Sequence, residues 1–192
     1  PYFCPMFQYR ITDGFLLSLA TNFKTPLKKD QGDCIRLICK YADVYSVTDV
    51  RAVAYMLATA YHECRFQPIK EIRAQPGTKM YDLQNRYWNT GFYGRGYVQL
   101  TWAKNYQKFS DLLKQDFVGN PDLVLIPENA AKILVHGMVH GSFTGKKLSD
   151  YFQTGKLRDW LGARRIVNGT DQAERVAEAA QKIHSLLVVD GM

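Results

Sequence analysis

The chain has 192 residues, of which 46% are hydrophobic and 22% charged, and its formal net charge at pH 7 is +7. This composition supports one well-packed core, so residues 1–192 are expected to form a single domain, or a module excised from a longer chain. The sequence contains no apolar run long enough to span a membrane, no signal peptide motif, no repeat and no low-complexity tract. The chain is therefore not expected to be an integral membrane protein or a repeat protein.

Helical periodicity predicts helices over residues 11–23, 33–44 and 50–61. The third segment shows the clearest apolar stripe, with Thr48 or Asp49 as its N-cap. Its other side is also mildly apolar, which indicates a buried central helix. Glu63 is expected to project from the last turn of this helix, opposite the stripe.

Between residues 65 and 97 the helical periodicity disappears, and proline and glycine interrupt the chain. A long loop with a short, irregular β-hairpin is expected there. Helices are predicted again over residues 102–113, 127–141, 156–165 and 171–187. The sequence thus predicts a mainly α-helical α+β domain with one irregular insertion, and an insertion of this kind is where a cleft is expected.

The four cysteines are irregularly spaced and form no CxxC pair, which argues against a zinc ribbon or a thioredoxin-like site. They are interpreted as small buried thiols. Their positions are Cys4, Cys34, Cys39 and Cys64.

Two carboxylates, Glu63 and Glu71, stand eight residues apart on either side of Pro68. The negative end of the helix dipole and dry surroundings disfavour the charged form of Glu63, as a general acid requires. Pro68 ends helical geometry, and the resulting turn makes a carboxyl separation of roughly 6.5–9.5 Å feasible, which is typical of inverting glycosidases. Taken alone, each glutamate is more simply an ion-pair partner of a neighbouring Arg or Lys.

His136 and His140 are spaced i, i+4 and could share a metal. With Glu63 they would suggest a zinc-dependent cell-wall peptidase, although packing is the simpler role for the pair. The protease motif HExxH is absent, because Phe66 stands where the second histidine would be. No metal and no organic cofactor are therefore expected.

A basic, aromatic-rich stretch runs from Arg65 to Arg95, with six basic residues against Glu71 and Asp82. Such a surface suits an anionic polymer, and aromatic faces stack on sugar rings as well as on bases. Nucleic acid is the rival ligand, but no nucleic-acid-binding motif accompanies the charges. A solvated basic loop is the simplest alternative.

One segment is specific enough to suggest a family. Residues 93–102 read Tyr-Gly-Arg-Gly-Tyr-Val-Gln-Leu-Thr-Trp, followed by Asn105-Tyr106. Further on come Asn-Pro-Asp-Leu at residues 120–123 and Arg-Ile-Val-Asn-Gly at 165–169. In this order they resemble glycoside hydrolase family 19, which comprises chitinases and peptidoglycan-cleaving lysozymes of phages and bacteria.

The resemblance implies a lysozyme-like fold with a small irregular β-hairpin lining the cleft. It implies that Glu63 is the general acid, that Glu71 is the general base and that the Thr101 hydroxyl holds the attacking water. It further implies contacts to the sugar, or positions in the cleft wall and floor, for Gln99, Asn105, Asn168, Tyr93 and Arg95. Arg95 could instead support a catalytic carboxylate.

Two departures from plant-type chitinases favour a lysozyme of the endolysin type: the short spacing between Glu63 and Glu71, and Tyr97 where chitinases often have proline. The expected function is an inverting N-acetylmuramidase, acting as a monomer on the β-1,4 bonds of bacterial peptidoglycan. An endolysin would pass from the host cytoplasm to the periplasm and cell wall, and the other route is secretion within a larger protein. A chitinase and a non-catalytic wall-binding or phage structural module remain as alternatives.

Overall fold

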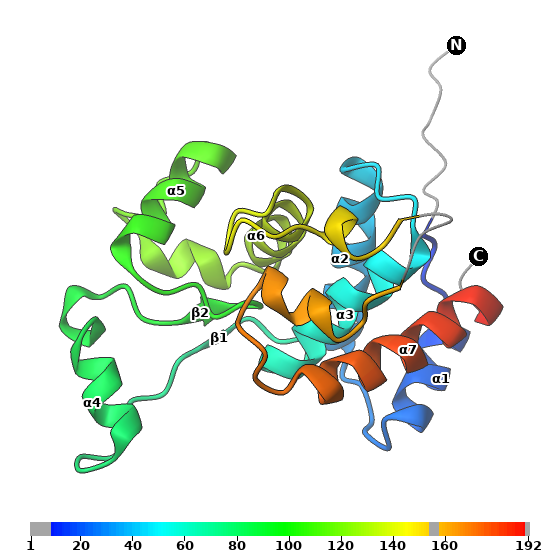
Figure 1. Ribbon diagram of the computed structural model, residues 1–192, viewed down its shortest axis with the longest axis horizontal. Helices are drawn as coiled ribbons and strands as arrows, with labels where there is room; N and C mark the ends of the chain where they lie inside the picture. Colours follow the sequence, from blue (N-terminus) through cyan, green and yellow to red (C-terminus); the bar gives the residue numbers. More distant parts are fainter. Residues whose placement is uncertain (1–8, 154–157, 191–192) are drawn as a thin grey trace.

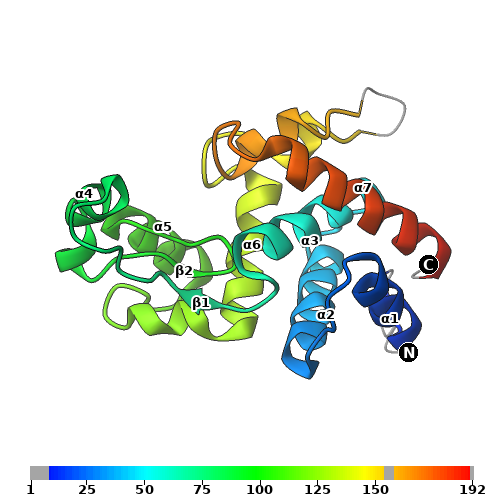
Figure 2. The ribbon, with the colours of Figure 1, turned by 90° about the horizontal axis from the view of Figure 1, so that it is seen from below.

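The computed structural model describes residues 9–153 and 158–190. Its helices are α1 (Asp13–Asn22), α2 (Lys29–Val44), α3 (Val50–Cys64), α4 (Lys79–Asn85), α5 (Ala103–Leu113), α6 (Pro127–His140) and α7 (Ala173–Asp190), and its strands are β1 (Ile69–Lys70) and β2 (Arg95–Gly96). Short 3₁₀ turns lie at Trp88–Thr90, Pro121–Leu125, Leu148–Asp150 and Gly162–Ile166. In Figures 1 and 2, α4, α5 and the strands lie on one side of the molecule and α1, α2 and α7 on the other, with α3 and α6 between them.

Helix α3 is the central element, as predicted. Its N-cap is Asp49, whose side chain accepts a hydrogen bond from the Arg51 backbone N–H, and it ends where Arg65 adopts a left-handed conformation at φ 53°. Residues 52–60 are all buried, and α3 packs mainly against α7. A helix that is buried all round places the residue after its last buried turn at the boundary between core and solvent, and this is where Glu63 lies.

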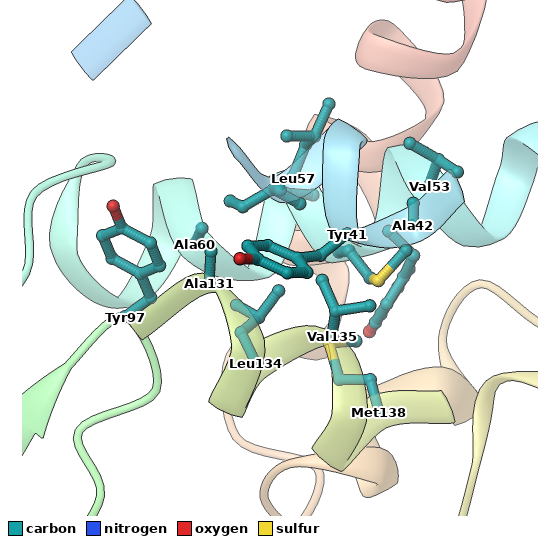
Figure 3. Packing of buried hydrophobic residues seen from close by; sticks show 14 of the residues in the cluster. Tyr41, Ala42, Val53, Leu57, Ala60, Tyr97, Ala131, Leu134, Val135 and Met138 are labelled. Carbon is teal, nitrogen blue, oxygen red and sulfur yellow. The ribbon is translucent and has the colours of Figure 1, made fainter. Parts of the chain in front are cut away.

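The core is one cluster of buried side chains that extends through both sides of the molecule. Figure 3 shows Val53 and Leu57 of α3 packed near Leu134, Val135 and Met138 of α6. The thiols of Cys34, Cys39 and Cys64 are buried and free, which confirms the prediction for these three residues. Cys4 lies outside the described residues.

The insertion after α3 was predicted only in part. The two strands pair antiparallel, Ile69 with Gly96 and Lys70 with Arg95, but 24 residues separate them, so they are not a tight hairpin. The intervening chain forms helix α4, which the sequence did not predict. Thr78 caps this helix by accepting from the Tyr81 backbone N–H. With seven residues, most of them exposed, α4 is too short to show an apolar stripe.

The second half of the chain follows the prediction more closely. Pro127 occupies the first turn of α6, and Gly141 ends that helix with φ 70°, as its proline-to-glycine span suggested. The helix predicted over residues 156–165 is wrong where the structure describes it, since a 3₁₀ turn at Gly162–Ile166 stands there instead. Within the described residues, no helix is both long and apolar enough to cross a membrane.

Candidate active site

A cleft of about 350 Å³ opens where α3 ends. Five of the predicted site residues line it: Glu63, Gln99, Thr101, Asn105 and Asn168. Its other walls come from Val98, Leu100, Trp102, Phe143 and Val167. Residues more than 100 positions apart in the chain therefore meet around Glu63.

Glu63 is paired with a buried arginine. The Arg164 Nη1 atom donates to Glu63 Oε1 at 2.7 Å, and the side chains are 3% and 18% exposed respectively. Arg164 also donates through Nε to the Asp171 carbonyl at 2.9 Å. The sequence did not predict this charged partner of Glu63.

The simpler ion-pair roles proposed for the two glutamates are not what the structure shows. Arg65 lies over the Tyr61 ring, 4.3 Å from its centre, and Lys70 pairs with Asp122 at 2.6 Å. Neither is the ion-pair partner of Glu63. Arg164 was missed because nothing in the sequence distinguishes it from the exposed Arg165 beside it.

Glu71 is held by three hydrogen bonds from uncharged donors. Its Oε1 accepts from Gln84 Nε2 at 2.9 Å and from the Tyr87 hydroxyl at 2.7 Å, and its Oε2 accepts from the Gly94 backbone N–H at 2.8 Å. Burial raises the pKa of Tyr87, and the bond to Glu71 raises it further, so the phenol keeps its proton and remains a donor. These contacts orient the carboxylate, as a general base requires.

Gly94 connects Glu71 to the cleft. A Cβ atom on Gly94 would stand 2.7 Å from Gln99 Oε1 and 3.2 Å from Glu71 Oε2, so both side chains flank this glycine. Gln99 itself lines the cleft beside Glu63. The absence of a side chain at position 94 therefore leaves room for both groups.

Substitution of Gly94 by Ala is expected to lower hydrolysis of a glycan substrate by about 10- to 100-fold, because the new methyl group displaces Gln99 and Glu71. The overpacking should cost only about 1–3 kcal/mol of unfolding free energy. The hydrolysis rate measures the first effect, and urea denaturation measures the loss of unfolding free energy. Gly169→Ala is the matched control, since a Cβ at that position meets nothing within 4 Å. Equal rates for the two variants would contradict the role given to Gly94.

The remaining polar residues of the cleft are oriented by the backbone. The Thr101 hydroxyl donates to the Gln99 carbonyl at 2.8 Å, which leaves its oxygen free to accept from a water or a sugar. Asn105 Nδ2 donates to the Thr101 carbonyl at 2.7 Å. Trp102 is 39% exposed at the cleft and packs edge-on against Tyr87 at 5.0 Å between ring centres. An exposed indole at a polar cleft is suited to stack on a sugar ring.

Tyr93 and Arg95 do not line this cleft. Arg95 is 4% exposed, pairs through Nε with Asp122 at 2.8 Å and donates through Nη1 to the Gly91 carbonyl at 2.9 Å. Its ion-pair partner is thus neither Glu63 nor Glu71, so it does not directly support either carboxylate. Substrate contact by Arg95 stays a prediction that its burial does not favour.

A stack of rings and guanidinium groups holds the loop that carries Glu71. Tyr93 stacks on Trp88 with 4.5 Å between ring centres, and Arg95 lies 4.0 Å from the Tyr93 ring centre. On the other side, Arg73 lies 4.9 Å from Trp88 and 4.5 Å from Tyr81. Such cation–π contacts each contribute about 0.5–2 kcal/mol. Tyr93 therefore supports this loop and does not line the cleft.

The histidine pair has the packing role proposed as its simpler interpretation. The rings of His136 and His140 lie 4.5 Å apart, and Tyr45 packs edge-on against both. Neither histidine lines the cleft with Glu63. Among the described residues, no group of three or more His, Cys, Asp or Glu side chains could hold a metal ion.

The partly buried side chain of His136 makes the stability of the fold depend on pH. Burial lowers the pKa of His136, and the neighbouring His140 lowers it further. The unfolded chain, with a histidine pKa of about 6.5, therefore binds more protons than the native state below this pH. The contribution of neutral His136 to the unfolding free energy should be complete above about pH 7.5. It should decrease as the pH falls through about 6.5. Melting temperatures between pH 5 and 8 test this expectation, and His136→Gln should flatten the slope. An unchanged slope would place the titrating group elsewhere.

A central helix that ends in a carboxylate at a polar cleft, beside a short antiparallel sheet, defines a lysozyme-like fold. No family model matches the sequence, and no curated protein is similar to it. Among solved structures, a chitinase C mutant is similar over 93% of this chain and 92% of that chain, with 17% identity and a TM-score of 0.58. Chitinase C from Streptomyces griseus HUT6037 is similar over 93% of this chain and 85% of that chain, with 17% identity and a TM-score of 0.51. Chitinase C is a glycoside hydrolase family 19 chitinase, so the fold predicted from the motifs is confirmed.

Proposed function

We propose that this protein is a glycosidase that hydrolyses the β-1,4 glycosidic bonds of bacterial peptidoglycan, as an N-acetylmuramidase. The observation that carries the proposal is the meeting of Glu63, Thr101, Asn105 and Asn168 in one cleft, with Glu71 held beside it. The fold supports only the glycosidase part of this proposal, since its similar structures are chitinases.

In the proposed mechanism, protonated Glu63 gives its proton to the glycosidic oxygen as the bond to the anomeric carbon breaks. Glu71 takes a proton from a water molecule that attacks this carbon from the opposite face, so the configuration is inverted. Thr101 accepts a hydrogen bond from that water. Arg164 holds the Glu63 carboxyl in position and, after transfer of the proton, stabilises the resulting carboxylate.

Charge favours peptidoglycan as the substrate. The chain carries a net charge of +7, and peptidoglycan, unlike chitin, bears carboxylates on its lactyl and peptide groups. The short Glu63–Glu71 spacing supports the same choice. Tyr97 is no longer an argument for peptidoglycan over chitin, because its side chain is fully buried and belongs to the core.

A chitinase is the second candidate, and the structural similarity to chitinase C favours it. The cleft residues proposed for catalysis would act in the same way on an uncharged polymer of N-acetylglucosamine. Of the cleft-lining residues, only Glu63 is charged, and Arg164 pairs with it, so the cleft itself does not distinguish the two glycans.

Product analysis tests the proposal. Purified peptidoglycan and chitin oligomers are each digested, reduced with borohydride and analysed by mass spectrometry. New reduced muramic acid ends support the N-acetylmuramidase. Reduced glucosamine ends from peptidoglycan would make the protein a glucosaminidase, and cleavage of chitin alone would favour the chitinase. Cut peptides on an intact glycan, or glycan binding without cleavage, would overturn the glycosidase.

A further inference from the structure

A second and larger cavity, of about 620 Å³, lies beside the cleft. It is an open hollow lined by the 3₁₀ turn at Gly162–Ile166 and the start of α7, which are drawn in orange and red in Figure 1. None of the motifs that indicate catalysis accounts for it. Its charged lining residues are Asp159, Arg165, Glu174 and Arg175.

The charges in this cavity are not paired with one another. Arg165 and Arg175 are exposed, and among the described residues no carboxylate lies within ion-pair distance of either. The same holds for Asp159 and Glu174, although one Asp159 oxygen accepts from the Gly162 backbone N–H at 2.7 Å. The preceding Arg164, in contrast, donates hydrogen bonds to Glu63 and to the Asp171 carbonyl. The cavity therefore offers two cations and two anions to a ligand.

The cleft and the cavity share one loop as a wall. Val167 and Asn168 line the cleft with Glu63, whereas Thr170 lines the cavity. Since Asn168 and Thr170 are two residues apart, their Cα atoms are separated by at most about 7 Å. Arg164 holds both ends of this loop, through its own backbone and through its bond to the Asp171 carbonyl. The linings of the cleft and of the cavity therefore adjoin at this loop.

We propose that this cavity binds the peptide stem of the wall glycan, an inference that rests on the proposed function. The stem is a short peptide, attached to the lactyl group of muramic acid, that carries several carboxylates and, in many walls, a free amino group. Arg165 and Arg175 would bind the carboxylates, while Asp159 and Glu174 would bind the ammonium group. Chitin has no such substituent, so the cavity would select peptidoglycan over chitin.

The test compares two substrates: intact peptidoglycan strands, and the same strands after an amidase has removed the stems. The readout is the ratio of kcat/KM on intact strands to kcat/KM on stem-free strands. The double variant Arg165→Gln/Arg175→Gln should lower this ratio about three- to tenfold, since exposed charge pairs contribute at most about 1 kcal/mol each. Arg10→Gln, which removes an exposed arginine outside the cavity, is the matched control and should leave the ratio unchanged.

A direct titration separates failure of this inference from failure of the proposed function. A free stem tetrapeptide that contains diaminopimelate is added to the protein, and the arginine Nε–H signals are followed by NMR. Shifts in the wild type that are absent in the double variant support the site even if no glycan is cleaved. If the wild type cleaves both substrates but the double variant keeps the wild-type ratio, the inference is overturned and the function stands. Absence of any shift at millimolar peptide would also overturn it.

Discussion

Replacing Glu63 by Gln is expected to lower glycan hydrolysis by about 10²- to 10⁴-fold, the range that general acid catalysis contributes. The amide cannot give a proton to the leaving oxygen, while its carbonyl oxygen can still accept from Arg164. Substrate binding should therefore change little. Release of reducing ends from purified peptidoglycan measures the rate, and the affinity for a non-cleaved wall fragment measures binding.

Glu178→Gln is the control for this variant, because it removes an exposed carboxylate of α7 that lines neither the cleft nor the adjacent cavity. It should retain the wild-type rate. Activity of Glu63→Gln near that of the wild type would refute the assignment of the acid. Equal loss of activity in both variants would point to a general effect of the charge change.

The individual helices of the fold were predictable where they depend on short-range patterns. The stripe of α3, its Asp49 cap and the proline that starts α6 were all visible in the sequence, because each depends on residues within a few turns of one another. Helix α4 was not visible, since its seven residues are held by the Thr78 cap and by contacts across the insertion. The predicted helix over residues 156–165 failed because a 3₁₀ turn satisfies the same local spacing.

The cleft residues were predictable where they belong to one contiguous sequence motif. Gln99, Thr101 and Asn105 stand within seven residues of one another, and all three line the cleft. The residues that hold Glu71 were missed, because Gln84 lies in the unpredicted helix α4 and Tyr87 lies just after it. Partners brought together only by the tertiary fold leave no local signal.

Arg164 is the clearest such partner, and its replacement by Met should have the largest effect on stability. The substitution leaves the Glu63 carboxylate, 18% exposed, without a counter-charge and removes the donor to the Asp171 carbonyl. Loss of one member of a buried ion pair costs about 3–5 kcal/mol, and the partial exposure of Glu63 places the expected cost nearer 2–3 kcal/mol. Urea denaturation at pH 7 measures it. Arg165→Met, at the exposed neighbouring position, should change the unfolding free energy by no more than about 0.5 kcal/mol.

The double variant Glu63→Gln/Arg164→Met shows where this cost originates. If an unpaired carboxylate is the cause, neutralising it should restore part of the stability, with a coupling energy of about 1–3 kcal/mol. If the two effects simply add, then Arg164 stabilises the fold through packing and the Asp171 carbonyl alone. In that case the pairing of Glu63 with a buried cation would serve catalysis without measurably raising the free energy of unfolding. The same arginine would then be maintained for its effect on the proton donor, since a hydrophobic residue of similar size would suffice for the core.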